Sequence, residues 1–161
     1  MKKRFTLKNI SIVFVFILLM IQSIQIDKTI QAVNPATDFI SVTAANSDVA
    51  GFLKTACYDC HSNQPTYPWY TSIAPVSWWI KHHINEGRQH LNFSIWSTYS
   101  EKRKNHKLEE CIEMIEEGEM PISSYTLMHG EAKLTDAQKF QLVEFFKALK
   151  NAMPQPEEEQ H

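Results

Sequence analysis

The feature that most constrains this chain is a cluster of potential ligands, CYDCH at residues 57–61, followed by a proline-rich stretch. Cysteines three positions apart lie on neighbouring turns of the backbone, so one group can bind both thiols while the adjacent imidazole faces the same group. Residues 62–75 contain Pro65, Pro68 and Pro75, which predict a loop with fixed turns. The rest of the chain must therefore fold around whatever these side chains hold.

Elsewhere the apolar residues recur at helical spacing. The third expected helix, for example, has an inward stripe of Leu108, Ile112 and Ile115. The sequence shows no strand pattern and no repeat, and its four glycines form no phosphate-binding loop. We therefore predict an all-α domain of four or five helices with long loops, and the main helices are expected at residues 47–56, 76–86, 101–117 and 135–153.

The ends of these helices follow from capping rules. Ser47 is the expected N-cap of the first helix, and Thr135 with Gln138 forms a capping box at the start of the last. Gly87 and Gly118 are expected to end the second and third helices.

The N-terminal segment, residues 1–26, has the pattern of an export signal. Four basic residues, Lys2, Lys3, Arg4 and Lys8, precede or border the apolar run at residues 10–21. Because no small-x-small cleavage site follows, we expect a retained hydrophobic helix that anchors the chain to the inner membrane, with the remainder on the periplasmic face. Cleavage to a soluble periplasmic protein is the alternative.

Three further segments follow the export segment. Residues 27–46 read as a polar tether, residues 47–153 as the folded domain, and residues 154–161 as an acidic disordered tail. Beyond residue 26 the chain has 12 basic and 18 acidic residues. This acidic balance argues against nucleic acid as a partner.

The order Cys57-x-x-Cys60-His61 is the pattern for attachment of a c-type haem. The two thiols can reach the two vinyl groups on one edge of the porphyrin, and His61 then supplies an iron ligand. A thioredoxin-like redox pair would require a βαβ setting, and a structural zinc site would need a fourth ligand such as Cys111. Cys111 is otherwise expected to be a buried apolar residue, with an intermolecular disulfide as the alternative.

Several aromatic residues near this motif could wall a porphyrin. We expect Tyr67, Trp69, Tyr70 and Trp79 to do so, and Trp78 to point elsewhere because adjacent helical residues diverge by about 100°. Arg88 could pair with a haem propionate, although a surface arginine is the simpler interpretation.

The second iron ligand is predicted to be Met120. It follows Gly118 and precedes Pro121, which places its thioether in a constrained loop outside a regular helix. His129 and Met128 are the rival candidates. Ligation by methionine and histidine is the arrangement of electron-transfer cytochromes c.

Three stretches together resemble the small bacterial haem-binding domain proteins of the cytochrome c type. These are CYDCHSNQPTYPWYTSIAPVSWW, HINEGRQHLNFSIW and GEMPISSYTLMHGEAKLT, and the similarity covers residues 49–150. The resemblance implies a cytochrome c-like fold around one covalent haem on Cys57 and Cys60, with iron on His61, and an N-terminal membrane segment. The exit from the apolar run, QSIQIDKT, departs from the more basic flank expected there.

The functional expectation is a one-electron carrier or relay that exchanges electrons with redox partner proteins and is not an enzyme. Two alternatives remain open. The first is a ligand sensor or peroxidase-like enzyme with an open distal position on the iron. The second is a haem-bearing module of a larger respiratory complex.

Overall fold

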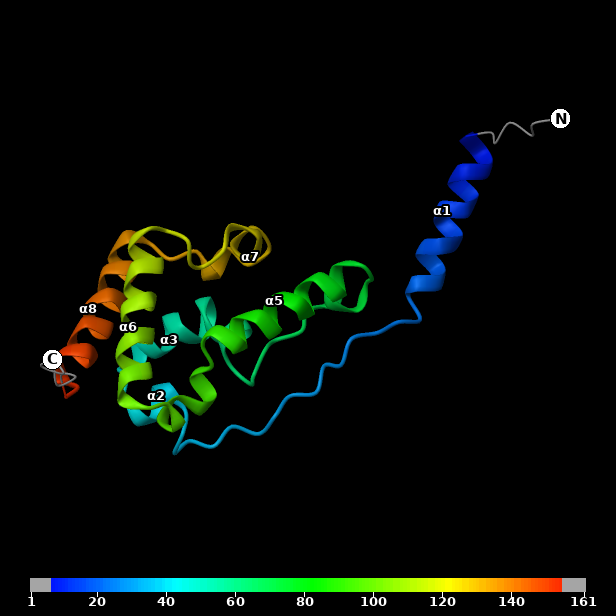
Figure 1. Ribbon diagram of the computed structural model, residues 1–161. Coiled ribbons are helices and arrows are strands. Elements are labelled where there is room, and N and C mark those ends of the chain that lie inside the picture. Colours follow the sequence, from blue (N-terminus) through cyan, green and yellow to red (C-terminus); the bar gives the residue numbers. More distant parts are fainter. Residues whose placement is uncertain (1–6, 155–161) are drawn as a thin grey trace, which may run out of the picture.

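The computed structural model describes residues 7–154, which form helices joined by loops and contain no strand (Figure 1). The all-α prediction is therefore confirmed for this part of the chain. The α-helices are α1 (Leu7–Ile21), α2 (Phe39–Val42), α3 (Ser47–Ala56), α4 (Tyr58–His61), α5 (Val76–His90), α6 (Glu101–Glu116), α7 (Ser123–Met128) and α8 (Asp136–Ala152). Three short 3-10 helices are η1 (Trp69–Ser72), η2 (Phe93–Thr98) and η3 (Gly130–Ala132).

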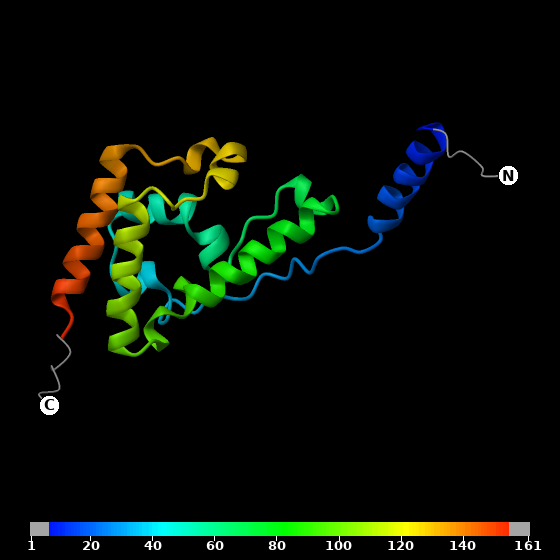
Figure 2. The ribbon, with the colours of Figure 1, turned by 45° about the horizontal axis from the view of Figure 1, so that its top comes forward.

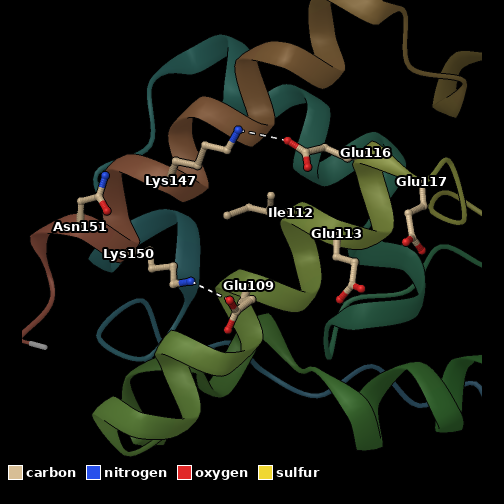
Figure 3. A pocket seen from close by; sticks show the side chains of 8 residues that line it. All are labelled: Glu109, Ile112, Glu113, Glu116, Glu117, Lys147, Lys150 and Asn151. Carbon is tan, nitrogen blue, oxygen red and sulfur yellow. Dashed lines mark hydrogen bonds and ion pairs between the residues drawn. The ribbon is translucent and has the colours of Figure 1, made fainter. Parts of the chain in front are cut away.

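The core lies where α2, α3, α6 and α8 meet. Helices α6 and α8 run antiparallel and side by side, with α3 packed against α8 (Figure 2). Their inward side chains are fully buried and include Phe39, Leu53, Leu108, Leu142 and Phe146. On the outer face, Lys147 pairs with Glu116 and Lys150 with Glu109, each at 3.0 Å (Figure 3).

The helix ends were largely predictable. Thr135 and Gln138 form the expected capping box of α8, and Gly118 follows α6 with a φ of 78°, in the left-handed region. At α3 the N-cap is Asn46 instead of Ser47, because the Asn46 side chain accepts a hydrogen bond from the Val49 N–H at 2.9 Å.

Helix α5 does not end at Gly87, as predicted, but continues to His90. The glycine has a different role, since α5 here touches the backbone of α4. A Cβ atom at position 87 would stand 2.8 Å from the carbonyl oxygen of Cys60. The missing side chain therefore allows α4 and α5 to approach each other closely.

The folded domain begins earlier than the predicted boundary at Ser47. Within the predicted tether 27–46, α2 places Phe39 in the core with none of its surface exposed. The buried Asp38 carboxylate accepts a hydrogen bond from the Tyr58 hydroxyl at 3.2 Å. The C-terminal part of the segment is thus structural, because its one aromatic residue completes the core.

The N-terminal apolar run forms α1, a helix of 15 residues with no buried residue. Among residues 7–154, no helix combines the length and the apolar character needed to cross a membrane. Lys2, Lys3 and Arg4 of the predicted export signal, and residues 155–161 of the predicted acidic tail, lie outside the described residues.

The contact at Gly87 yields a prediction on stability. Gly87→Ala should lower the free energy of unfolding by about 1–3 kcal/mol, because the new methyl group meets backbone that cannot move independently. Gly51→Ala is the matched control, since Gly51 is also helical and has open space around it. It should stabilise the protein by about 0.5–1 kcal/mol. Urea unfolding measures both, and a Gly87→Ala protein as stable as Gly51→Ala would contradict the close approach.

A second prediction concerns the extended core. Phe39→Ala should cost about 3–5 kcal/mol of unfolding free energy, as for other large core truncations. Phe140→Ala, at a phenylalanine that is 66% exposed on α8, should change it by less than about 0.5 kcal/mol. If the two variants lose similar stability in thermal or urea unfolding, Phe39 is not part of the core.

Candidate functional site

The CYDCH motif lies where α3 passes directly into α4. Cys57 ends α3, and its carbonyl accepts the first hydrogen bond of α4, from the His61 N–H at 2.9 Å. Cys57 packs against the hydrophobic core, whereas Cys60 lines a cavity. Cys111, which was expected to be buried, is partly buried and also packs against the core.

Both motif thiols are held in their protonated form. Burial raises the pKa of Cys57 to about 12 and that of Cys60 to about 11. Such thiols lack the thiolate character of reactive redox cysteines. Residues 7–154 assemble no group of three or more histidine, cysteine or carboxylate side chains that could hold a metal ion by itself.

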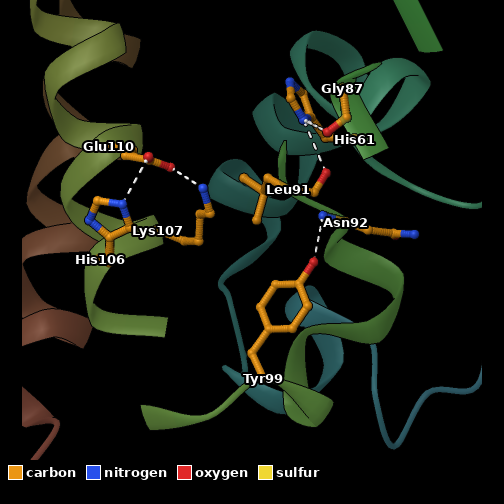
Figure 4. A network of polar contacts seen from close by, with 8 residues as sticks. All are labelled: His61, Gly87, Leu91, Asn92, Tyr99, His106, Lys107 and Glu110. Atoms are coloured by element: carbon orange, nitrogen blue, oxygen red, sulfur yellow. Dashed lines mark hydrogen bonds and ion pairs between the residues drawn. The ribbon is translucent and has the colours of Figure 1, made fainter. Parts of the chain in front are cut away.

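The His61 imidazole is oriented by the C-terminal end of α5 (Figure 4). Its Nδ1 lies 3.0 Å from the Gly87 carbonyl oxygen and 3.2 Å from that of Leu91. Carbonyl oxygens only accept, so Nδ1 carries the proton and donates it to them. Burial lowers the pKa of His61, which favours the neutral ring. The Nε2 lone pair is therefore available to a metal, the arrangement in which histidine ligands are commonly held.

The backbone that orients His61 is itself fixed. The Tyr99 hydroxyl accepts a hydrogen bond from the Asn92 N–H at 2.9 Å, next to the Leu91 carbonyl (Figure 4). Tyr58, the neighbour of Cys57, stacks on Phe93 with ring centroids 5.4 Å apart. The segment that follows α5 therefore contacts the motif at two places, Tyr58 and His61.

A largely apolar cavity of about 310 Å³ opens beside Cys60. Its size is at the lower end of the range for small-ligand sites, about 300–1,000 Å³. Helices α4, α5 and α7 and the η1 segment enclose it. The lining residues are Asp59, Cys60, Thr66, Pro68, Tyr70, Thr71, Val76, Trp79, Ile80, His83, Ile84, Ile122, Ser124, Tyr125, Met128 and His129.

The structure separates the predicted aromatic residues into two groups. Tyr70 and Trp79 line the cavity, whereas Tyr67 and Trp69 are not among its lining residues. Trp69 is largely exposed, and the buried Tyr67 hydroxyl has no hydrogen-bond partner among residues 7–154. Trp78 points elsewhere, as expected, and donates its indole N–H to the Ile24 carbonyl at 2.9 Å.

One side of the cavity is tied to the motif through Asp59. The Tyr125 hydroxyl donates to the Asp59 carboxylate at 2.7 Å, and the Thr66 N–H donates to its other oxygen at 2.9 Å. Burial, followed by the bond to Asp59, raises the pKa of Tyr125. Asp59 therefore connects α4 to both α7 and the proline-rich loop.

His129 lies in the same wall with both ring nitrogens engaged. Its Nδ1 is 3.2 Å from the Glu131 carboxylate, which only accepts, so Nδ1 carries the proton. Its Nε2 then accepts a hydrogen bond from the Tyr70 hydroxyl. The Tyr125 ring stacks on the imidazole at a centroid distance of 4.3 Å. His129 is thus positioned as a hydrogen-bonding group.

Met120 is half-buried, and its backbone N–H donates to the Met114 carbonyl at 3.1 Å. The cavity is lined by the nearby Ile122 and by the rival candidates Met128 and His129, but Met120 is not among the lining residues. The structure therefore brings the two rivals beside Cys60, and ligation by Met120 stays a prediction.

A second hollow, of about 640 Å³, lies over the seam between α6 and α8 (Figure 3). Its lining is mainly Glu and Lys side chains, several of them paired across the two helices. A charged, salt-bridged surface of this kind does not suit a porphyrin, so the cavity beside Cys60 is the better candidate site.

Comparison with protein families adds an independent observation. The family model for the haem-binding domain matches residues 16–148, which is most of the chain. The chain belongs to the haem-binding domain family. No curated protein and no solved structure shows significant similarity to it.

The side chains of this haem-binding domain fit the group that the family implies. His61 presents a neutral Nε2, and Cys57 and Cys60 precede it in the motif. Arg88 supplies a further observation. Its Nε donates to the Ser62 carbonyl at 2.7 Å, while its Nη2 is buried without a hydrogen-bond partner in the described part of the chain. A buried guanidinium N–H without an acceptor costs about 1–3 kcal/mol, and a carboxylate of a bound group would satisfy it.

Sequence reasoning missed several residues of this site. Asp59 and Tyr125 are ordinary polar residues in their local sequence, and their contact joins segments 66 positions apart. The role of Gly87 was misread because a glycine near a helix end resembles a stop signal. Only the spatial proximity of α4 and α5 reveals its function.

Proposed function

We propose that this haem-binding protein carries one haem c, joined by thioether bonds to Cys57 and Cys60 and ligated through its iron by His61. The observation that carries the proposal is the orientation of His61, whose Nδ1–H is directed at two backbone carbonyls so that Nε2 is free to coordinate. The family membership supports haem as the cofactor.

The surrounding residues have supporting roles. Gly87 and Leu91 hold the imidazole in one tautomer, and Arg88 offers its unpartnered N–H to a carboxylate. Tyr70 and Trp79 contribute aromatic rings to the wall of the cavity beside Cys60, and an apolar wall influences the potential of a redox centre nearby.

The proposed activity is one-electron transfer between redox partner proteins. A bound haem iron supplies a reversible one-electron change, and two protein ligands leave it without an open position for substrate. Met120 is the proposed second ligand. We further propose that α1 anchors the chain at the periplasmic face of the inner membrane, because its apolar side chains are exposed on all sides in the folded protein.

Covalent attachment can be tested by intact mass. Protein secreted by a host with haem-attachment machinery should have the mass of the polypeptide plus one haem. Cys57→Ala and Cys60→Ala should each give bare polypeptide or a haem held by the one remaining thioether bond. Cys111→Ala, which removes the third cysteine, should keep the full haem mass. A wild-type mass equal to that of the bare polypeptide would refute covalent attachment, and haem retained by the double variant Cys57→Ala/Cys60→Ala under denaturing conditions would place the attachment at other residues.

The second ligand can be tested by absorption spectroscopy. The oxidised protein should show the methionine–iron charge-transfer band, and the reduced spectrum should not change with carbon monoxide. Met120→Ala should abolish the band and open the iron to carbon monoxide. Met128→Ala, at a methionine that lines the cavity, is the control and should retain the band. Loss of the band in Met128→Ala alone would transfer the role to Met128.

A second candidate function rests on the hydrogen-bonded group Tyr70, His129 and Glu131. Tyr70 and His129 both line the cavity, so a ligand bound there could replace the hydrogen bond between them and contact the imidazole without His129 coordinating iron. This would suit a ligand sensor or a peroxidase-like enzyme with an open distal position. Ready binding of carbon monoxide by the wild-type reduced protein, with an affinity altered by His129→Gln, would favour this candidate over electron transfer.

A further inference from the structure

Four apolar side chains form an exposed surface at the mouth of the cavity, around the N-terminal end of α5. We call this surface the apolar rim; it consists of Trp69, Ile73, Val76 and Trp79. Trp69 is 74% exposed, and the other three are between 43% and 47% exposed. Val76 and Trp79 also line the cavity, so the rim borders its entrance. Clustered exposed apolar residues of this kind mark an interaction surface.

The segment after α1 is fastened to this same end of α5. The Gln22 side chain donates to the Ala74 carbonyl and accepts from the Ala74 N–H, each at 3.0 Å. The Trp78 indole N–H donates to the Ile24 carbonyl at 2.9 Å, and the Lys81 ammonium donates to the Asp27 carbonyl at 2.7 Å. The base of α1 is therefore next to the N-terminal end of α5, as both ribbon views show (Figures 1 and 2).

Helix α1 extends away from the domain and makes no buried contact with it. From Ile12 to Ile21 every residue is apolar, so this part of the helix has no polar face to turn towards water. Large apolar side chains on all sides, including Phe14, Phe16 and Leu19, are exposed. A helix that is hydrophobic all round requires an apolar surrounding, which a lipid bilayer supplies.

We propose that the apolar rim itself rests in the lipid interface, so that the cavity mouth faces the bilayer. This inference rests on the proposed anchoring by α1 and not on the proposed electron transfer. The inference is based on the position of the rim next to the anchor, because hydrogen bonds from residues 22–27 keep the rim beside the point where α1 leaves the domain.

The chemistry of the rim fits a lipid interface. Tryptophan is the side chain that collects at the boundary between headgroups and acyl chains, and the rim has two, Trp69 and Trp79. Lys28 lies beside the rim, where its ammonium donates to the Ser72 hydroxyl at 2.6 Å. In this position beside the rim, the positively charged Lys28 would also be attracted to the negatively charged headgroups of a bilayer. With α1 anchored in the bilayer, a soluble redox partner or a second copy of the chain would have to displace the membrane surface to reach the rim.

The test is photolabelling of the full-length haem-loaded protein in vesicles of phosphatidylcholine and phosphatidylglycerol. The vesicles contain a trace of phosphatidylcholine with a diazirine in its acyl chain, and labelled peptides are mapped by mass spectrometry. We expect the peptide that covers residues 69–80 to be labelled to an extent similar to α1. The labelling should be several-fold above that of the peptide with Phe140 on α8, a phenylalanine whose exposed fraction of 66% lies within the range of the rim residues.

Two variants sharpen this test. Trp69→Ser/Trp79→Ser should lower the labelling of Ile73 and Val76, whereas Phe140→Ser should leave it unchanged. If α1 is labelled but the peptide of residues 69–80 is labelled no more than the Phe140 peptide, the inference is overturned, and the rim faces water or a protein partner. Unchanged labelling in the double tryptophan variant would overturn it as well. If α1 also stays unlabelled, the proposed anchoring fails too, while the absorption spectrum of the same sample reports haem binding separately.

Discussion

The structure depends on the close contact between α4 and α5, where the backbone of Cys60 rests on Gly87. Because no side chain intervenes, the Gly87 and Leu91 carbonyls come within hydrogen-bond distance of His61 Nδ1. One packing contact thus fixes the position of the CYDCH turn, the tautomer of its histidine and the direction of the free nitrogen. The core of α2, α3, α6 and α8 supports this unit from one side, and the proline-rich loop closes the other.

The haem-binding domain family gives these features a common purpose. A neutral imidazole with a free Nε2, two protonated thiols and an arginine whose buried N–H has no partner among residues 7–154 are separate observations, and the covalently attached haem that we propose would use all of them. The cavity beside Cys60 adds an apolar space whose wall includes a hydrogen-bonded histidine, His129. Its mouth opens at the apolar rim beside α1, which connects the site to the proposed membrane position of the chain.

Much of this was accessible from the sequence, because it depends on local rules. Capping at Thr135, the turn at Gly118 and the all-helical pattern follow from neighbouring residues. The errors arose where distant segments meet. Phe39 belongs to the core although its local sequence reads as a tether. Gly87 lies inside a helix, and a glycine is needed there because the backbone of Cys60, 27 positions earlier, comes too close for a side chain. Likewise, the cavity gathers Tyr70 and Trp79 but not Tyr67 or Trp69, since which aromatic residue faces inward depends on the path of the proline-rich loop.

The most direct test of the account is pulsed electron paramagnetic resonance of the oxidised, haem-loaded protein with ¹⁵N-labelled histidine. A background with His83→Gln and His129→Gln removes both imidazoles that line the cavity. The account predicts that a histidine nitrogen couples strongly to the ferric iron in this variant, as expected if His61 Nε2 is its ligand. If no coupling to a histidine nitrogen is seen, the contact between α4 and α5 does not prepare an iron ligand, and the central claim is wrong.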